Sequence, residues 1–586
     1  MMLDQVLAHC GHLPDVWGEG ALFAFSGLDG PTDTLSGWVG TYAHEPYGLL
    51  FHTPRRRCLD LTCAGDTQPR VCTGDVLGVD TPAGALLVAY SAWHTLVGLV
   101  PAGARLTLRM EAGPAAEERD GMQVSIDPQG RDAVALARAD RRLALAYGRS
   151  AAEAACRARE GLASDACAVA SQRLAPYRSL PRLAEPRWDR LLRKAASVLR
   201  VNTLAAEGTV GQAWSTPDRV PHRDCWLWDT VFQSFALNLV APRTSWETLQ
   251  SVLAAQLPDG RIAHQIDARG WASAITQPPI LSWGVWENWG VLRERDALEY
   301  ALPRLEGYLE WDLAHRDRNG NGLLEWRITG DARCRSGESG MDNSPRFDLA
   351  LELDAVDFSA FAAHDMGCLA RIADALGDRD RAVRWRERAD ALSAQVHALL
   401  WDAQTRFYLD RALDGAFSPV RAVSGFVPLL LEDTPPSHVE ALVAALRDSR
   451  QFDSAFPVAS VAVSDPAWCT DMWRGATWVN YNQIIAAGLE RHGRANEARR
   501  LVATSLETLE RYYRRYGVLF EFYDAQDKVP PVACDRKGPH QEPYDLRRKV
   551  DAIRDYGWTA AAAVCWLLNY DERAVSQESS VARQCE

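Results

Sequence analysis

Residues 496–516 read NEARRLVATSLETLERYYRRY, and the arrangement of charge in this stretch decides the fold class. Charged side chains gather on one side of the segment when it is drawn as a helix, which is the pattern of a helix at the outside of a protein. After Arg187 nearly all of the chain reads as helix, in about twelve segments separated by loops, and several of the other segments are apolar on more than one face. Charged helices outside and apolar helices inside predict a mainly α chain, with the twelve segments paired as an (α/α)6 toroid.

The first 150 residues differ from the rest. Short alternating or apolar runs such as ARLTLRMEAG (residues 104–113) and RLALAYG (142–148) are separated by turn residues, which predicts a β-sandwich-like N-terminal domain. We therefore divide the chain into a β-rich domain at 1–150, a helical connector at 151–186, the toroid at 187–573 and a polar tail at 574–586.

The composition indicates a soluble enzyme that acts on a small substrate. The chain has 586 residues, 47% of them hydrophobic, and a net charge of −13, which argues against a general affinity for nucleic acid or anionic membrane. No apolar run approaches the roughly 20 residues that span a bilayer, and the N-terminus does not resemble a secretory signal. Thirteen cysteines at irregular spacing indicate reduced thiols and a cytoplasmic location. The oligomeric state is unknown from these features.

The loops between the predicted helices carry acids, amides and aromatic side chains together. Examples are HRDCWLWDT (222–230), TQPPILSW (276–283), GESGMDNSPRF (337–347), DMWRGATWVNYNQ (471–483) and GVLFEFYDAQ (517–526). Many of the 21 tryptophans lie in such polar surroundings, where an indole suits the face of a sugar ring, although core packing accounts for most tryptophans in most proteins. These loops predict a site that grips hydroxyl groups and performs acid–base chemistry on a small carbohydrate.

Several of these segments resemble glycoside hydrolase family 63 and its relatives, including mannosylglycerate and glucosylglycerate hydrolases. SGMDNSPRFD (339–348) is similar to the family's acid-bearing motif, MWRGATWVNYNQ to its WRGP-x-W-x-N-x-N segment with Ala476 in place of proline, and FEFYDAQ to the segment of its base. The resemblance covers roughly residues 187–570. Trehalases of family 37 are a weaker match.

The resemblance implies roles for individual residues. Asp342 would be the general acid and Glu521 the general base, and no cofactor would be required. The substrate-binding residues would be Trp228, Asp229, Gln277, Glu338, Trp473, Arg474, Asn480 and Trp558. Inverting hydrolysis needs an acid and a base roughly 6.5–9.5 Å apart, and the acid keeps its proton only where burial or a negative neighbour raises its pKa. Arg346 would be a receptor for a substrate carboxylate if it faced the pocket.

Each of these assignments has a simpler alternative. Asp342 could cap a turn, Glu521 could form a structural ion pair, and Asp229 could cap the helix that follows it. Residues 317–325, DRNGNGLLE, resemble the first part of an EF-hand loop and predict a possible structural calcium site at Asp317, Asn319, Asn321 and Glu325. The bidentate glutamate at position 12 is replaced by Ile328, so a self-capped turn without metal is the alternative.

The function predicted from the sequence is that of an inverting, exo-acting α-glycosidase. Its substrate would be a small α-glucoside or α-mannoside such as glucosylglycerate, mannosylglycerate or an α-glucosyl disaccharide. Alternatives are a trehalase-like hydrolase, a sugar epimerase or isomerase on the same toroid, a phosphorylase, and a carbohydrate-binding relative without activity. The dinucleotide, P-loop, HExxH and GxSxG motifs are absent from the sequence, which argues against those chemistries.

Overall fold

The computed structural model describes residues 2–43, 48–62, 65–113, 115–539 and 551–570, so the predicted polar tail at 574–586 lies outside the described residues. The chain forms two compact units. The N-terminal unit consists of Met1–Arg223, Leu509–Leu519 and Arg554–Val564, and the helical unit of Asp224–Thr508, Phe520–Ile553 and Cys565–Glu586. The domain boundaries drawn from the sequence remain predictions.

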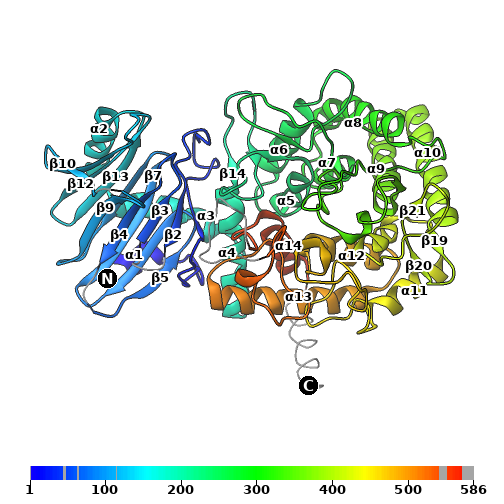
Figure 1. Ribbon diagram of the computed structural model, residues 1–586. Coiled ribbons are helices and arrows are strands. Elements are labelled where there is room, and N and C mark those ends of the chain that lie inside the picture. The colour runs from blue at the N-terminus through cyan, green and yellow to red at the C-terminus, as the bar shows by residue number, and fades with distance from the viewer. Residues whose placement is uncertain (1, 44–47, 63–64, 114, 540–550, 571–586) are drawn as a thin grey trace. The chain divides into compact units, whose positions relative to one another are not determined.

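The N-terminal unit contains two antiparallel sheets (Figure 1). The five-stranded sheet has the order β1 (Leu22–Phe23), β2 (Gly40–Ala43), β3 (Gly48–Phe51), β4 (Arg57–Thr62) and β9 (Arg105–Met110). The eight-stranded sheet has the order β10 (Glu117–Arg119), β11 (Met122–Ile126), β12 (Ala133–Ala139), β13 (Arg142–Gly148), β8 (Thr95–Leu99), β7 (Gly84–Ala92), β6 (Val76–Thr81) and β5 (Gln68–Cys72). The predicted β-rich N-terminal region is therefore confirmed.

Alternation of side chains explains why these segments form strands. In β9, Leu106, Leu108 and Met110 are buried while Arg105 is exposed. Leu106 and Leu108 pair with Leu61 and Leu59 of β4, so the apolar residues of the two strands share one face.

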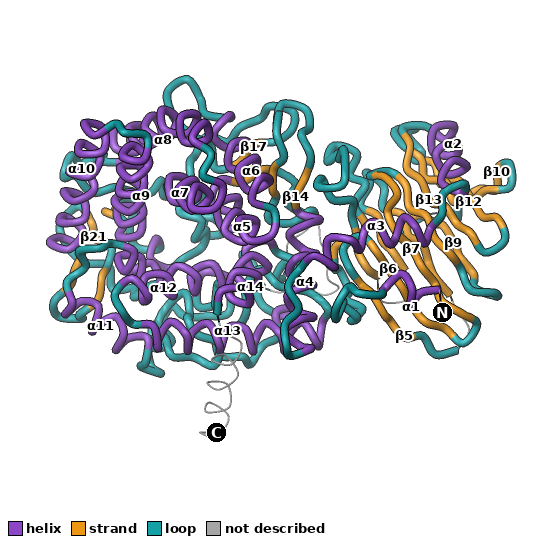
Figure 2. The backbone as a smooth tube through the Cα atoms, turned by 180° about the vertical axis from the view of Figure 1, so that it is seen from behind, coloured by secondary structure: helices purple, strands orange, loops and turns teal. Residues whose placement is uncertain are grey.

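Two helices cover the eight-stranded sheet. A short helix, α1 (Met2–Leu7), precedes the strands. Ser150 and Asp165 cap α2 (Ala151–Leu162) and α3 (Ala166–Ser179) by accepting hydrogen bonds from first-turn amides. The helix α2 packs on β12 and β13, and α3 packs on β7, as Figure 2 shows from behind. The longer α4 (Pro186–Asn202) follows in the same unit.

The helical unit contains most of the segments predicted to be helices of the toroid, whereas the first of them, at residues 187–204, corresponds to α4 of the N-terminal unit. The helices of the helical unit are α5 (Leu227–Val240), α6 (Pro242–Ala254), α7 (Leu281–Leu292), α8 (Arg295–Arg316), α9 (Val356–Ala375), α10 (Arg379–Leu399), α11 (Pro436–Leu446) and α12 (Val479–Arg491), while α13 (Ala495–Tyr516) and α14 (Gly557–Asn569) have residues in both units. None of the helices in the described ranges is long and apolar enough to cross a membrane.

The packed pair of α9 and α10 shows the two kinds of helix side by side. In α9 nearly every residue from Val356 to Ala373 is buried, whereas α10 buries a single stripe that includes Ala382, Trp385 and Val396. A helix buried on nearly all sides, packed against a helix that buries a single stripe, is the contrast between inner and outer helices that the sequence predicts.

One predicted helix has a different form. Residues Val423–Leu430 form a 3₁₀ helix, η2, with Pro428 inside it. Proline lacks the amide hydrogen that an α-helix needs and its ring clashes with the preceding turn, which accounts for the tighter, shorter element. η2 still contacts α9 and α12, as an inner helix would.

Candidate active site

The loop that carries Asp342 is held against the first turn of α5. Gly340 has a φ of +71°, and a Cβ atom on it would lie 2.3 Å from Cζ2 of Trp228. Only glycine allows this close approach in this backbone conformation. Two residues later, the carbonyl oxygen of Asp342 accepts a hydrogen bond from the amide of Ser336 at 3.2 Å, which closes the loop. The irregular sequence therefore fixes the position of a carboxylate.

Glu521 lies on an extended segment with its backbone bonded on both sides. Its amide donates to the carbonyl of Ile553 at 2.8 Å, and two residues later Tyr523 exchanges two backbone hydrogen bonds with Thr477. Phe522 stacks on Trp478 with ring centroids 5.0 Å apart. These contacts place Glu521 beside the WRGATW segment.

Two consecutive basic residues bind the two predicted catalytic carboxylates. Arg536 Nε and Nη2 donate to the two oxygens of Glu521 at 2.9 and 3.0 Å, and Lys537 Nζ lies 2.5 Å from Asp342 Oδ2. Neighbouring Cα atoms are about 3.8 Å apart, so this dipeptide brings Asp342 and Glu521 into one site. Arg536 and Lys537 could not be predicted from the sequence, because a basic pair in a loop carries no distinguishing pattern.

The two ion pairs differ in their access to solvent. The side chains of Arg536 and Glu521 are 4% and 3% exposed, whereas those of Lys537 and Asp342 are 25% and 22% exposed. A ligand can therefore reach the Asp342 side of the site without breaking the buried pair.

The pKa of Asp342 contradicts one expectation from the sequence. Burial raises the pKa of this carboxyl, but the charge and hydrogen bond of Lys537, helped by Arg536 and His264, outweigh burial and hold the pKa below its ordinary value. Burial lowers the pKa of Lys537, and Asp342 more than reverses this, so the Lys537 pKa is raised. Without a bound ligand, Asp342 is thus an ionised carboxylate and not the protonated acid that we expected.

Asp471 fastens the basic dipeptide to the loop of Asp342. Its carboxylate accepts hydrogen bonds from the amides of Lys537 at 2.7 Å and Gly538 at 2.9 Å, and from Asn343 Nδ2 at 3.0 Å. Asn343 Oδ1 in turn accepts from the amide of Trp473 at 3.1 Å. Asp471 therefore ties three segments of the site together, a role that the sequence did not suggest.

The predicted aromatic and amide residues form a buried layer. Trp473 stacks on Trp478 at 3.8 Å and lies 6.4 Å from Trp228. Gln277 Oε1 accepts a hydrogen bond from the amide of Trp228. The amide of Asn480 is fully buried, and neither its oxygen nor its nitrogen has a hydrogen-bond partner among the described residues. Such a group has unused capacity for a hydroxyl ligand.

The remaining predicted site residues are distributed as follows. Asp229 is 2% exposed and lies in the first turn of α5. Glu338 is bound by Arg316 at 2.7 and 3.0 Å and by two backbone amides, which favours a supporting role. Arg474 pairs with Asp348 at 2.7 Å. Trp558 belongs to the N-terminal unit, where it packs on Tyr556.

Arg346 is not available as a carboxylate receptor, which corrects our hypothesis. It is 1% exposed and donates two hydrogen bonds each to Asp357 and Asp410, at 2.5–2.8 Å. All of its strong donors are used inside the fold, so Arg346 is a structural residue.

The EF-hand-like loop closes itself through its own hydrogen bonds. Glu325 accepts from Arg318 Nε at 2.9 Å, and the Nδ2 groups of Asn319 and Asn321 donate to Asp354 at 2.9 and 2.8 Å. Asp317 Oδ2 accepts from the amide of Gly322, and only Oδ1 of this carboxylate is buried without a partner in the described loop. Amide nitrogens and an arginine occupy the places where a calcium site needs oxygen. The residues as arranged do not fit calcium, which remains a prediction from the sequence alone.

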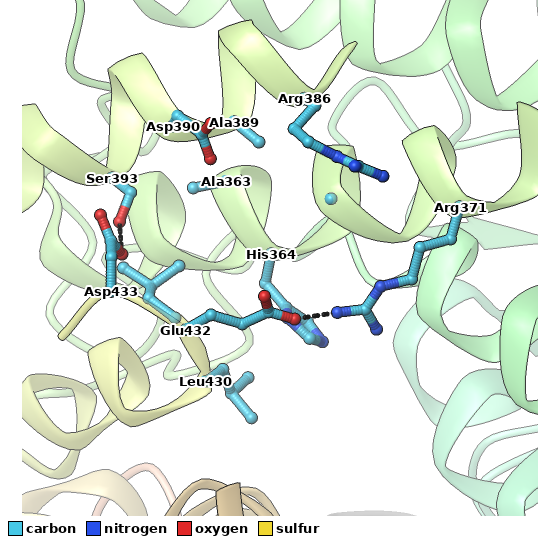
Figure 3. Close-up of a pocket in the computed structure, with 12 residues that line it drawn as sticks. Ala363, His364, Arg371, Arg386, Ala389, Asp390, Ser393, Leu430, Glu432 and Asp433 are labelled. Carbon is cyan, nitrogen blue, oxygen red and sulfur yellow. Dashed lines mark hydrogen bonds and ion pairs between the residues drawn. The ribbon is translucent and has the colours of Figure 1, made fainter. Parts of the chain in front are cut away.

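A separate cavity of about 360 Å³ lies between α9, α10 and the end of η2 (Figure 3). Arg371 points at Glu432 in its wall, and Ser393 donates to Asp433. Arg371 is 14 residues along α9 from Asp357, or roughly 21 Å at 1.5 Å per residue. The cavity contains none of the predicted catalytic residues, so the candidate active site is the one around Asp342 and Glu521.

Comparison with known proteins agrees with the resemblance seen in the sequence. Residues 221–559 match the model of the mannosylglycerate hydrolase MGH1-like glycoside hydrolase domain. Mannosylglycerate hydrolase MGH1 of Selaginella moellendorffii is 24% identical over 455 residues, which cover 64% of this chain and 86% of that protein. Glucosylglycerate hydrolase of Mycolicibacterium hassiacum is 32% identical over 195 residues, covering 27% of this chain and 40% of that one. An uncharacterized protein of Borreliella burgdorferi matches at 24% identity, and the match covers 45% of this chain and 54% of that protein.

Among solved structures, the family 63 mannosylglycerate hydrolase of Thermus thermophilus in complex with Tris and D-glycerate aligns with a TM-score of 0.51 at 22% identity. The alignment covers 64% of this chain and 99% of that one. At this identity the similarity establishes the fold of the helical part.

Proposed function

Because this chain belongs to the family of the mannosylglycerate hydrolase MGH1-like glycoside hydrolase domain, among the relatives of family 63, and is therefore a glycoside hydrolase, we propose that it is an inverting, exo-acting α-glycosidase. Its proposed substrate is a small α-mannoside or α-glucoside whose leaving group carries a carboxylate, with mannosylglycerate first and glucosylglycerate second. The names of the relatives support this order over an α-glucosyl disaccharide or trehalose.

In the proposed reaction, Asp342 protonates the glycosidic oxygen while Glu521 removes a proton from a water that attacks the anomeric carbon from the opposite face. The observation that carries this assignment is the pairing of Arg536 with Glu521 and of Lys537 with Asp342, which gathers two carboxylates from loops about 180 residues apart into one site. Proton transfer by two carboxylic groups is the chemistry that a glycosidase needs.

Substrate binding is assigned to the side chains around these carboxylates. Asn480 offers an amide with unused hydrogen-bonding capacity, and Trp473 and Trp228, which are 1% and 2% exposed, form the packed wall behind it. We assign weaker parts to Asp229, Gln277, Glu338 and Arg474, and a part for Trp558 remains a prediction from the sequence. The alternation of α9 and α10 supports the (α/α)6 toroid as the frame of the site. A cytoplasmic location remains a prediction from the cysteine content.

Proton NMR of the first product tests the proposal. The purified protein is mixed, in phosphate-free buffer, with mannosylglycerate, glucosylglycerate, trehalose and simple α-mannosides and α-glucosides, and the released anomer is followed. An inverting enzyme releases β-sugar first. α-Sugar as the first product would refute inversion, and no hydrolysis of any member would refute the proposed substrate class. Phosphate-free buffer also excludes phosphorolysis as the source of the signal.

A further inference from the structure

The ion pair between Lys537 and Asp342 conflicts with the proposed role of Asp342. A general acid must hold a proton when the substrate is bound, whereas a carboxylate 2.5 Å from an ammonium group stays ionised. If the ammonium group moved away, burial, which is the largest single influence on the pKa of Asp342, would be opposed mainly by the more weakly acting Arg536 and would favour the protonated carboxyl. The position of Lys537 therefore controls whether Asp342 can act as an acid.

The backbone of Lys537 is held by hydrogen bonds, whereas its side chain is partly exposed. Asp471 accepts the amides of Lys537 and Gly538, and Arg333 Nε donates to the carbonyl of Lys537 at 3.1 Å. The ammonium group lies at the end of a flexible four-carbon chain, and the Lys537 side chain is 25% exposed. Among the described residues, its ion-pair partner is Asp342. Lys537 can thus change partner without moving the loop.

The other groups that face Asp342 cannot take the place of Lys537. Burial lowers the pKa of His264 to about 4, so this ring is neutral near pH 7, and burial raises the pKa of the Cys334 thiol to about 11. Arg536 is charged, but both of its bonded nitrogens are held by Glu521. Of the groups that face Asp342 in the described site, Lys537 is therefore the movable charge.

We propose that Lys537 recognises the carboxylate of the leaving group and, by moving from Asp342 to that carboxylate, releases Asp342 to take up the proton that it donates in catalysis. This inference rests on the proposed function. The charges balance: a lysine–aspartate pair, a substrate carboxylate and one proton from solvent become a lysine–substrate pair and a neutral Asp342. A neutral leaving group offers the ammonium group no new partner, so Lys537 stays on Asp342 and the acid stays ionised. Lys537 is thus a specificity-determining residue for anionic leaving groups.

Proton uptake on binding tests the inference without any substitution. D-Glycerate, the free leaving group of the proposed substrate, is titrated into the wild-type protein at pH 6 in two buffers that differ in ionisation enthalpy, with glycerol as the uncharged control. We expect at least half a proton to be taken up per bound glycerate and none with glycerol. Glycerate that does not bind, or that binds without proton uptake, overturns the inference.

Kinetics provide a second test with a matched control. Mannosylglycerate and its uncharged methyl ester are compared in the wild type, in Lys537→Met and in Lys528→Met, which removes an exposed lysine of the same segment. A charge-assisted hydrogen bond of about 1.5–3 kcal/mol corresponds to a preference of roughly 10–150-fold in kcat/KM for the acid over the ester. We expect this preference in the wild type and in Lys528→Met, and its loss in Lys537→Met.

The possible failures are distinguishable. If Lys537→Met slows the acid and the ester by the same factor, Lys537 has a general role and the inference is wrong while the proposed function stands. If the wild type hydrolyses neither these compounds nor any other α-mannoside or α-glucoside, the proposed function itself is wrong.

Discussion

Lys537 Nζ lies 2.5 Å from Asp342 Oδ2, although the two residues are 195 positions apart in the sequence. The residue before it, Arg536, binds both oxygens of Glu521. The two carboxylates that the sequence marks as acid and base are therefore held by one dipeptide that the sequence does not mark at all. Without ligand, Lys537 holds Asp342 as an ionised carboxylate, and catalysis requires this arrangement to change at Asp342.

Replacing either carboxylate should remove most of the activity. We expect Asp342→Asn and Glu521→Gln each to lower kcat by roughly 10²–10⁴-fold, because each change removes one proton-transfer group. A dinitrophenyl α-mannoside separates the two roles, because its leaving group departs without a proton. On this substrate the Asp342→Asn variant should regain much of the wild-type kcat, whereas the Glu521→Gln variant should remain slow. The exposed Glu310→Gln is the control. Equal losses of both variants on both substrates would contradict the assignment.

Most of the helices and the motif loops could be predicted from the sequence, because hydrophobic periodicity is a local signal and the family segments are short. The sequence also named Asp342 and Glu521 as acid and base, roles that stay predictions, and it predicted inner and outer helices, a contrast that α9 and α10 show. Local signals do not contain long-range pairing, which is why Arg536, Lys537 and Asp471 were missed. For the same reason Arg346, which reads as a possible receptor in the loop, is bonded in the structure to Asp357 and Asp410.

Glycine at position 340 should be essential for the placement of Asp342. Alanine there would adopt a left-handed φ of +71° and press its Cβ against Trp228, at a combined cost on the order of 3 kcal/mol. Gly493→Ala is the control, because it has a similar φ of +69° with open space around its Cβ position and should cost about 1–2 kcal/mol. Urea unfolding and kcat measure the two effects. Equal stability losses, with normal kcat in Gly340→Ala, would show that the contact with Trp228 is unimportant.

Arg346 should contribute to stability and not to substrate binding. Arg346→Met leaves Asp357 and Asp410 buried without their cation, which costs about 3–5 kcal/mol. Arg384→Met removes a half-exposed arginine that pairs with Glu306 and should cost less than about 1 kcal/mol. Denaturant unfolding of both variants measures the difference. A stable Arg346→Met protein with a raised KM only for carboxylate substrates would restore the receptor hypothesis.

Calcium should have little effect on the protein. The oxygens of Glu325 and the Nδ2 groups of Asn319 and Asn321 are bonded within the loop or to Asp354, so the loop needs no cation to hold its shape. We expect the Tm in EDTA to equal that in calcium chloride within about 1 °C, since one kcal/mol shifts the Tm of a large domain by only about 2–4 °C. A rise of several degrees with calcium that disappears in Asp317→Ala would instead establish a calcium site.

The stability of the protein should depend on the ionisation of His264 in weak acid. Burial lowers the pKa of His264 from 6.5 to about 4, so between these values the unfolded chain binds a proton that the folded chain does not. This contribution is fully present above pH 6.5 and is lost as the pH falls toward 4, by up to about 3 kcal/mol at 1.36 kcal/mol per pKa unit. We expect the free energy of unfolding of the wild type to fall by about 2–3 kcal/mol more than that of His264→Gln between pH 7.5 and pH 4.5, measured with urea. Parallel pH dependences in the two proteins would mean that His264 is solvated in the folded state and that the Asp342 side of the site is more open than its packing indicates.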